Sequence, residues 1–159
     1  MKALVVYYSR TGNTKQVAEM IAGELKADLE ELVDKKGRRG LLGYLRSGRD
    51  AVRDKTTELK PLQRQSSDYD LIFVGTPVWA SRPAPAVRAF LESQDLSGKK
   101  VALFCTMASR GEEATFSTMR TLFPQAEVAG QLAVAMKKEN RSQIEERVAQ
   151  WVTPWKSKD

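Results

Sequence analysis

The sequence contains no histidine and only one cysteine among its 159 residues. The absence of histidine excludes Ser-His-Asp and Cys-His nucleophilic catalysis, acid–base chemistry by imidazole and nearly all zinc sites. A single cysteine cannot form an internal disulfide, which favours a cytoplasmic location. We therefore expect no catalytic side chains of the usual kinds and no metal, and a bound cofactor would have to supply any difficult chemistry.

Long hydrophobic runs are missing as well. No stretch approaches the roughly 18 apolar residues that a membrane span needs, so we expect no membrane association. Only residues 3–8 form an apolar run after Met1 and Lys2, which is too short for a signal peptide. Hydrophobic residues make up 42% of the chain and charged residues 29%, a composition typical of globular proteins. At this length we expect one domain over residues 1–159.

The formal net charge of +6 is concentrated in one part of the chain. Residues 34–60 carry nine basic and four acidic side chains, so this segment accounts for +5 of the total. Two interpretations are open for the basic patch between Lys35 and Arg53. Its charges either form exposed pairs on a solvated helix face or dock an acidic partner protein. Nucleic acid fits less well, because aromatic residues do not alternate with the charges.

Five apolar stretches are predicted to be strands: residues 2–8, 29–33, 71–75, 101–106 and 131–136. The first, third and fourth are almost continuously apolar, as strands buried on both faces are. Helical periodicity lies between them, at residues 17–25, 41–52, 87–91, 116–123 and 144–155. The alternation predicts an α/β fold with a parallel sheet and helices on both faces. Ligands of such sheets bind beyond the carboxyl ends of the strands, which makes three following segments candidate sites.

The segment after the first strand is polar and leads directly into a predicted helix, with Asn13 and Thr14 as its cap. Hydroxyl and amide side chains, one glycine and the positive end of the helix dipole suit a phosphate group. The segment has neither the lysine of a Walker A loop nor the glycines of a dinucleotide fingerprint. An ordinary polar turn is the alternative interpretation. The candidate residues are Ser9, Arg10, Thr11, Gly12, Asn13 and Thr14.

The run Ser-Arg-Thr-Gly-Asn-Thr, after a strand Lys-Ala-Leu-Val-Val-Tyr-Tyr, resembles the phosphate-binding loop of flavodoxins. The resemblance extends over essentially the whole chain, which has the length of a short-chain flavodoxin. It implies a flavodoxin-like three-layer sandwich whose five parallel strands follow the order 2-1-3-4-5. It also implies FMN as the cofactor and electron transfer from the bound flavin to a protein partner. The acidic partner of the basic patch would then be a redox protein, and the chain a monomer or a weak homodimer.

A tryptophan follows the third strand, in a segment stiffened by two prolines. The resemblance implies that Trp79 stacks on the flavin ring and that the backbone of Thr76, Pro77 and Val78 contacts it. The alternative is that the indole packs beneath its own loop.

The segment after the fourth strand lacks an aromatic residue, whereas many flavodoxins carry a second one there. The resemblance still implies that the backbone of Ala108, Ser109 and Gly111 donates hydrogen bonds to the flavin. The cofactor-binding candidates of this segment are Thr106, Met107, Ala108, Ser109, Arg110 and Gly111. One flavin face would be left open, so the alternative function is an FMN-dependent NAD(P)H oxidoreductase acting on a quinone or another small acceptor. A binding module that has kept the fold and lost the cofactor is a third possibility. Cys105 is expected to lie in a buried strand and to be inert.

Each of the three candidate segments carries one arginine: Arg10, Arg82 and Arg110. Low-potential flavodoxins usually surround the flavin with acidic residues, which oppose the negative charge of the reduced flavin. With arginines in their place, a bound flavin should be easier to reduce here. A cation about 8 Å from the flavin would stabilise its negative charge by roughly 2 kcal/mol at an effective dielectric constant of 20.

Overall fold

The computed structural model describes residues 1–35 and 57–157, and its centre is a parallel sheet. The spatial order of the parallel strands is β2 (Asp28–Glu31), β1 (Ala3–Tyr7), β3 (Leu71–Trp79), β5 (Lys100–Met107) and β6 (Glu127–Ala135). Each neighbouring pair of these five is parallel. This arrangement confirms the predicted order 2-1-3-4-5. One short strand is additional: β4 (Arg82–Pro83) pairs antiparallel with β3.

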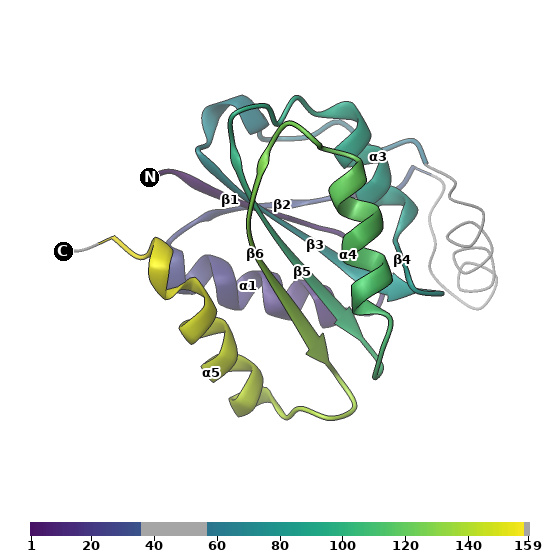
Figure 1. The fold of residues 1–159 in the computed structure, drawn as a ribbon, viewed down its shortest axis with the longest axis vertical. Helices are drawn as coiled ribbons and strands as arrows, with labels where there is room; N and C mark the ends of the chain where they lie inside the picture. The colour runs from purple at the N-terminus through teal and green to yellow at the C-terminus, as the bar shows by residue number, and fades with distance from the viewer. Residues whose placement is uncertain (36–56, 158–159) are drawn as a thin grey trace.

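Helices cover both faces of the sheet (Figure 1). On one face lie α1 (Asn13–Leu25) and α5 (Arg141–Val152), and on the other lie α3 (Pro85–Ser93) and α4 (Glu112–Thr121). Successive strand residues alternate between the two layers, as the pleat requires. Val5 joins the cluster beneath α1 and α5, while Val6 joins the cluster beneath α3 and α4. The predicted α/β three-layer fold is therefore confirmed.

The central strands are buried on both faces, as their continuous apolar runs predict. Val5 and Val6 in β1 and Phe73 and Val74 in β3 are each 0% exposed. Burying such a side chain contributes roughly 1.5–3 kcal/mol relative to leaving it in water. The sheet thus gives a rigid frame to the segments that follow its strands.

Two strands extend four residues beyond a predicted end. β3 runs on to Trp79, beyond the predicted end at Gly75, because its last residues pair with β5 and β4. β6 begins at Glu127, before the predicted start at Gln131. β6 is an edge strand whose first two residues are exposed, so its beginning lacks the apolar signature of a buried strand.

The C-terminal helix and the turn that follows it contain two of the three tryptophans. α5 begins with a capping box between Asn140 and Gln143, and the 3₁₀ turn Thr153–Trp155 follows it. Trp151 and Trp155 lie edge-on to the ring of Phe73, with centroids 5.5 and 5.4 Å away. These two indoles therefore pack against the core beneath α1 and α5.

The predicted helix of residues 41–52 lies outside the described residues. Within the described part of the chain, no helix has the length and apolarity to cross a membrane.

Candidate functional site

The carboxyl-terminal edge of the sheet brings the three predicted segments together. Thr14 Oγ1 lies 2.8 Å from Thr106 Oγ1, which joins residues 9–14 to residues 106–111. A Cβ atom at Gly111 would lie 2.8 Å from Val78 Cγ1 and 3.2 Å from Ser81 Oγ, so the third segment packs closely against the second. The sequence predicted that all three segments lie at this edge, and the structure shows which contacts link them.

Residues 9–14 form an open turn at the start of α1. The N-cap is Gly12 in the left-handed conformation, with φ of 98°, and not the predicted Asn13 or Thr14, which lie inside the helix. Glycine adopts this conformation without strain. Gly12 N–H donates to Ser9 Oγ at 3.0 Å, and α1 has no side-chain cap. Beyond its two neighbours in the chain, no described residue lies within 4 Å of the place that a Gly12 Cβ would occupy. The N–H groups of the first helical turn have no partner within a helix, and Gly12, Asn13 and Lys15 are exposed at this turn.

Residues 76–83 were expected to form a loop, but most of them form a β-hairpin. Thr76, Pro77, Val78 and Trp79 belong to β3, and Trp79 pairs with Arg82 of β4. Ala80 and Ser81 form the two-residue turn with φ of 50° and 59°. Turns of this kind favour Asn-Gly or Gly-Gly, so Ala-Ser did not signal one. A residue with a side chain is destabilised by roughly 1–2 kcal/mol in the left-handed conformation. The pairing of β3 with β4 must therefore hold Ala80 and Ser81 in this conformation.

The Thr76 hydroxyl closes the base of this hairpin. It donates to the Pro77 carbonyl oxygen at 2.8 Å and accepts a hydrogen bond from Ala84 N–H at 2.9 Å. Thr76 is 0% exposed, so its side chain is committed to the hairpin itself. Sequence reasoning did not anticipate this role, because Ala84 is eight residues away and belongs to the chain after β4.

Trp79 is half-buried at the end of β3. Its ring lies edge-on to Tyr8, the residue just before the open turn, with ring centroids 5.6 Å apart and an interplanar angle of 85°. It also packs partly against the core beneath α3 and α4. Part of the indole surface thus packs within the protein, and the rest is accessible. Its stacking on a flavin stays a prediction.

Residues 106–111 connect β5 to α4. Thr106 and Met107 are the last residues of β5 and are buried, whereas Ala108, Ser109 and Arg110 are exposed. Gly111, with φ of 106°, is the N-cap of α4. The side chains exposed here include no aromatic ring.

Cys105 lies in β5 immediately before this segment and is 0% exposed, as predicted. Burial, with a smaller contribution from the charge of Glu112, raises the pKa of its thiol to about 12. The thiol is therefore protonated at neutral pH and is a poor nucleophile.

The positive charges at this edge differ in their surroundings. Arg10 and Arg82 are half-buried, whereas Arg110 is exposed. Lys35, the first residue of the basic patch, forms an ion pair with Glu58 at 2.5 Å, and both side chains are largely exposed. Such a pair contributes little to stability and neutralises part of the local charge. The remainder of the patch, residues 36–53, lies outside the described residues.

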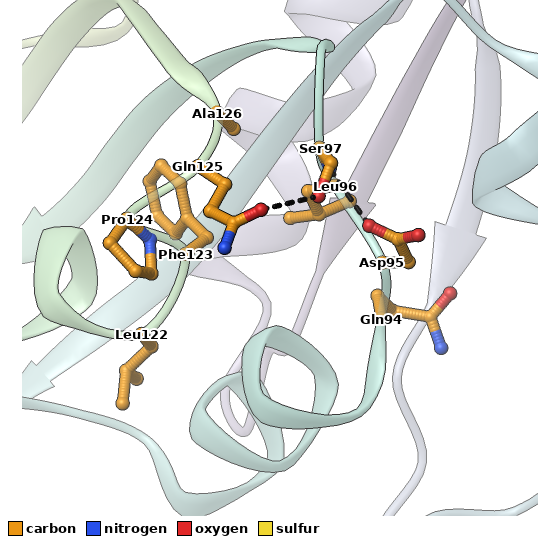
Figure 2. Close-up of a pocket in the computed structure, with 9 residues that line it drawn as sticks. All are labelled: Gln94, Asp95, Leu96, Ser97, Leu122, Phe123, Pro124, Gln125 and Ala126. Carbon is orange, nitrogen blue, oxygen red and sulfur yellow. Dashed lines mark hydrogen bonds between the residues drawn. The ribbon is translucent and has the colours of Figure 1, made fainter.

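A cavity of about 240 Å³ lies at the opposite edge of the sheet (Figure 2). It is formed by residues 94–97, before β5, and residues 122–126, before β6. Its polar groups already pair with one another, since Ser97 N–H donates to Asp95 at 3.0 Å and Ser97 Oγ to Gln125 at 3.3 Å. None of the predicted site residues lines this cavity, so it is separate from the candidate site.

The candidate site suits a ligand with an anionic end and a flat end. An anion at residues 9–14 would receive the free N–H groups of α1 and the favourable field of its dipole. A flat ring bound at this edge of the sheet would meet the accessible part of Trp79. Apart from the neighbouring Thr11 and Asn13, no described residue lies within 4 Å of the Cβ position of Gly12, so an anion can approach the turn from that side.

Comparison with known proteins supports this interpretation. The family model described as flavodoxin matches residues 2–154. A flavoprotein of Lactobacillus acidophilus, solved in complex with FMN, is 27% identical over 96% of this chain and 99% of its own, with a TM-score of 0.76. No curated protein sequence gives a significant match.

Two further solved structures share the fold at lower identity. A flavodoxin, WrbA-like protein of Agrobacterium tumefaciens is 18% identical over 96% of both chains, with a TM-score of 0.61. Oxidised flavodoxin 2 of Bacillus cereus is 23% identical over 94% of both chains, with a TM-score of 0.57. At these identities the likeness concerns the fold alone.

Proposed function

Because the chain belongs to the flavodoxin family, we propose that it binds FMN at the carboxyl-terminal edge of its sheet and passes electrons from the flavin to a protein partner. FMN, when bound, supplies the redox chemistry, and the protein binds and orients it. The observation that carries the proposal is the open turn of residues 9–14 beside the half-buried Trp79, with Tyr8 in contact with the indole. The similar flavoprotein solved with FMN supports the same cofactor.

The chain offers several donors to the phosphate. The N–H groups of the first turn of α1 point toward the N-terminal end of the helix, where the dipole favours a dianion. Ser9 Oγ accepts from Gly12 N–H, so its own hydrogen is available for a phosphate oxygen. Thr11 and Asn13 are exposed at the same turn and add a hydroxyl and an amide.

The first test is the visible absorption spectrum of the purified protein, followed by titration of the apoprotein with FMN and with riboflavin. We expect a yellow protein or stoichiometric uptake of FMN. Because riboflavin lacks the phosphate, its dissociation constant should be at least about 100-fold higher, the effect of losing two charge-assisted hydrogen bonds. A colourless protein that takes up neither flavin would contradict the proposal and favour a binding module without cofactor.

A second candidate function is that of an FMN-dependent NAD(P)H oxidoreductase acting on a quinone or another small acceptor. The observation that favours it is the exposed segment Ala108, Ser109 and Arg110, which brings no aromatic ring to the site. Anaerobic mixing of the FMN-loaded protein with NADPH distinguishes the two functions. An electron-transfer protein stays oxidised without its partner, whereas the oxidoreductase is bleached promptly.

The partner that we propose is an acidic redox protein, on the basis of the sequence charge of residues 34–60. Association steered by charge weakens as salt screens it. Electron transfer to an acidic acceptor protein should therefore slow as ionic strength rises from 20 to ~200 mM, the range over which the Debye length falls below about 10 Å. A rate that is independent of salt would contradict this choice of partner.

A further inference from the structure

Two buried threonine hydroxyls connect the open turn to the end of β5. Thr14 is 1% exposed and Thr106 is 4% exposed, and their Oγ1 atoms lie 2.8 Å apart although the residues are 92 positions apart in the sequence. Thr14 lies in the first turn of α1, and Thr106 is the next-to-last residue of β5. This hydrogen bond joins two of the three candidate segments at the carboxyl-terminal edge of the sheet.

The pair has one more hydrogen than its hydrogen bond uses. Each hydroxyl has one hydrogen, and the bond between them uses only one of the two. Within the described part of the chain, neither hydroxyl has another hydrogen-bond partner. A buried donor without an acceptor costs free energy, so this pair favours a ligand that brings an acceptor.

The position of Thr14 indicates which hydrogen remains available. Thr14 is the residue of the pair that lies in the uncapped first turn of α1, where the helix dipole and free N–H groups favour an anion. If Thr106 donates to Thr14, the Thr14 hydrogen is directed to that anion. Accepting a hydrogen bond also polarises the Thr14 hydroxyl and makes it a stronger donor.

We propose that Thr106 is a positioning residue for the FMN phosphate: its hydroxyl donates to Thr14 and thereby orients the Thr14 hydrogen toward a phosphate oxygen. This inference rests on the proposed function, because it requires that the phosphate binds at residues 9–14. It replaces the expectation of a flavin contact by Thr106 with an indirect role for its side chain. It also means that a residue of the third segment affects recognition of the phosphate and not of the ring.

The experiment compares Thr106→Val, Thr106→Ser and wild type, with dissociation constants for FMN and riboflavin measured by flavin fluorescence. Valine keeps the shape of the side chain and removes the donor, whereas serine keeps the donor. We expect Thr106→Val to weaken FMN binding about tenfold, the value of about one hydrogen bond, and to leave riboflavin binding unchanged. Thr106→Ser should restore the wild-type ratio of the two constants.

Thr115→Val is the matched control. Thr115 is 0% exposed and its hydroxyl donates to the Gly111 carbonyl oxygen at 2.8 Å, so this variant also removes a buried threonine hydroxyl near the third segment. It leaves the pair of Thr14 and Thr106 intact. The ratio of the FMN and riboflavin constants should therefore equal that of wild type. The ³¹P resonance of bound FMN gives a second measurement, and it should shift in Thr106→Val and not in Thr115→Val.

The outcomes separate this inference from the proposed function. Wild-type protein that binds no FMN overturns both. If wild type binds FMN and Thr106→Val weakens FMN and riboflavin by the same factor, Thr106 has only a structural role and the inference is wrong. An unchanged FMN constant in Thr106→Val also overturns it. If Thr106→Val does not fold, the decision rests on Thr106→Ser, in which an altered ratio of the two constants contradicts the inference.

Discussion

The ring of Phe104 in β5 occupies the space above Gly75 in β3, where a side chain would otherwise project. The two residues are partners in the parallel ladder, and a Cβ atom at Gly75 would collide with the phenyl ring. Gly75 directly precedes the part of β3 that enters the hairpin. The close packing of Phe104 on Gly75 therefore positions β3 just before it enters the hairpin.

Gly75→Ala should lower the free energy of unfolding by about 3 kcal/mol, at the upper end of the usual cost of overpacking a core. Chemical denaturation measures this value. Phe104→Leu in the same chain removes the colliding ring atoms, so the double variant should lose less stability than the two single variants added together. Additive losses would show that the collision is not the cause.

Gly111→Ala should lower the free energy of unfolding by about 2 kcal/mol, because it combines a positive φ with close approach to Val78 and Ser81. Gly23→Ala is the matched control. Gly23 lies inside α1, and apart from its neighbours and the backbone of its own helix no described atom lies within 4 Å of its Cβ position. Alanine should therefore raise stability by about 0.5–1 kcal/mol there. Equal effects at the two positions would contradict the packing of residue 111 against the hairpin.

The turn of Ala80 and Ser81 should be strained, because both residues have a positive φ. Replacing both by glycine relieves this strain, and the greater flexibility of glycine in the unfolded chain offsets part of the gain. We expect a net increase of about 1 kcal/mol in the free energy of unfolding, measured by chemical denaturation. A decrease would mean that the two side chains stabilise the hairpin by contacts that outweigh the strain.

Trp79→Ala should weaken FMN binding about tenfold, because stacking of an indole on a flat ring contributes roughly 0.5–1.5 kcal/mol beyond the area it buries. Trp79→Phe should lose less. Titration of the apoproteins with FMN measures both constants. Wild type should also lose tryptophan fluorescence on binding. This loss should be smaller in Trp79→Phe, because the remaining Trp151 and Trp155 pack against the core beneath α1 and α5 and not at the candidate site. An unchanged affinity in Trp79→Ala would favour the interpretation that the indole only packs beneath its own hairpin.

Glu139 should make stability depend on pH in the acidic range. Burial by itself would raise the pKa of this carboxyl, but hydrogen bonds from Arg147 at 2.6 Å and Ala135 N–H at 2.9 Å, with the charge of Arg147, lower the pKa below its ordinary value. A carboxyl whose pKa is lowered by folding stabilises the folded protein at pH values above its ordinary pKa of about 4.3. This stabilisation is lost as the pH falls through the pKa that the carboxyl has in the folded protein.

Glu139→Gln should accordingly cost about 1 kcal/mol at pH 7 and show a weaker loss of stability than wild type below about pH 5. Urea unfolding midpoints between pH 7 and ~pH 3 measure both effects. Identical pH dependence in the two proteins would contradict the role of Glu139.

Much of the candidate site could be located from the sequence because its parts are local in sequence. Residues 9–14 directly follow a buried strand and open a helix, and both properties are visible in adjacent residues. The identity of the cap could not be predicted in the same way, since Asn and Thr are usual cap residues and Gly12 takes the position through its left-handed backbone. The sequence pattern did not predict the extension of β3, because Pro77 has a weak strand propensity and Ala80-Ser81 is not a typical turn sequence. Pairing with β4 and β5 outweighs these local preferences.

The sequence by itself determined the layered α/β architecture, the order of its elements and the three segments that meet at one sheet edge. It could do so because apolar runs, helical periodicity and strand ends are properties of neighbouring residues. Only the tertiary structure decided that Thr14 meets Thr106, that Phe104 covers Gly75 and that Gly111 lies against Ser81. These contacts join residues distant in the chain, and their geometry depends on strand register and close packing, which no local pattern encodes.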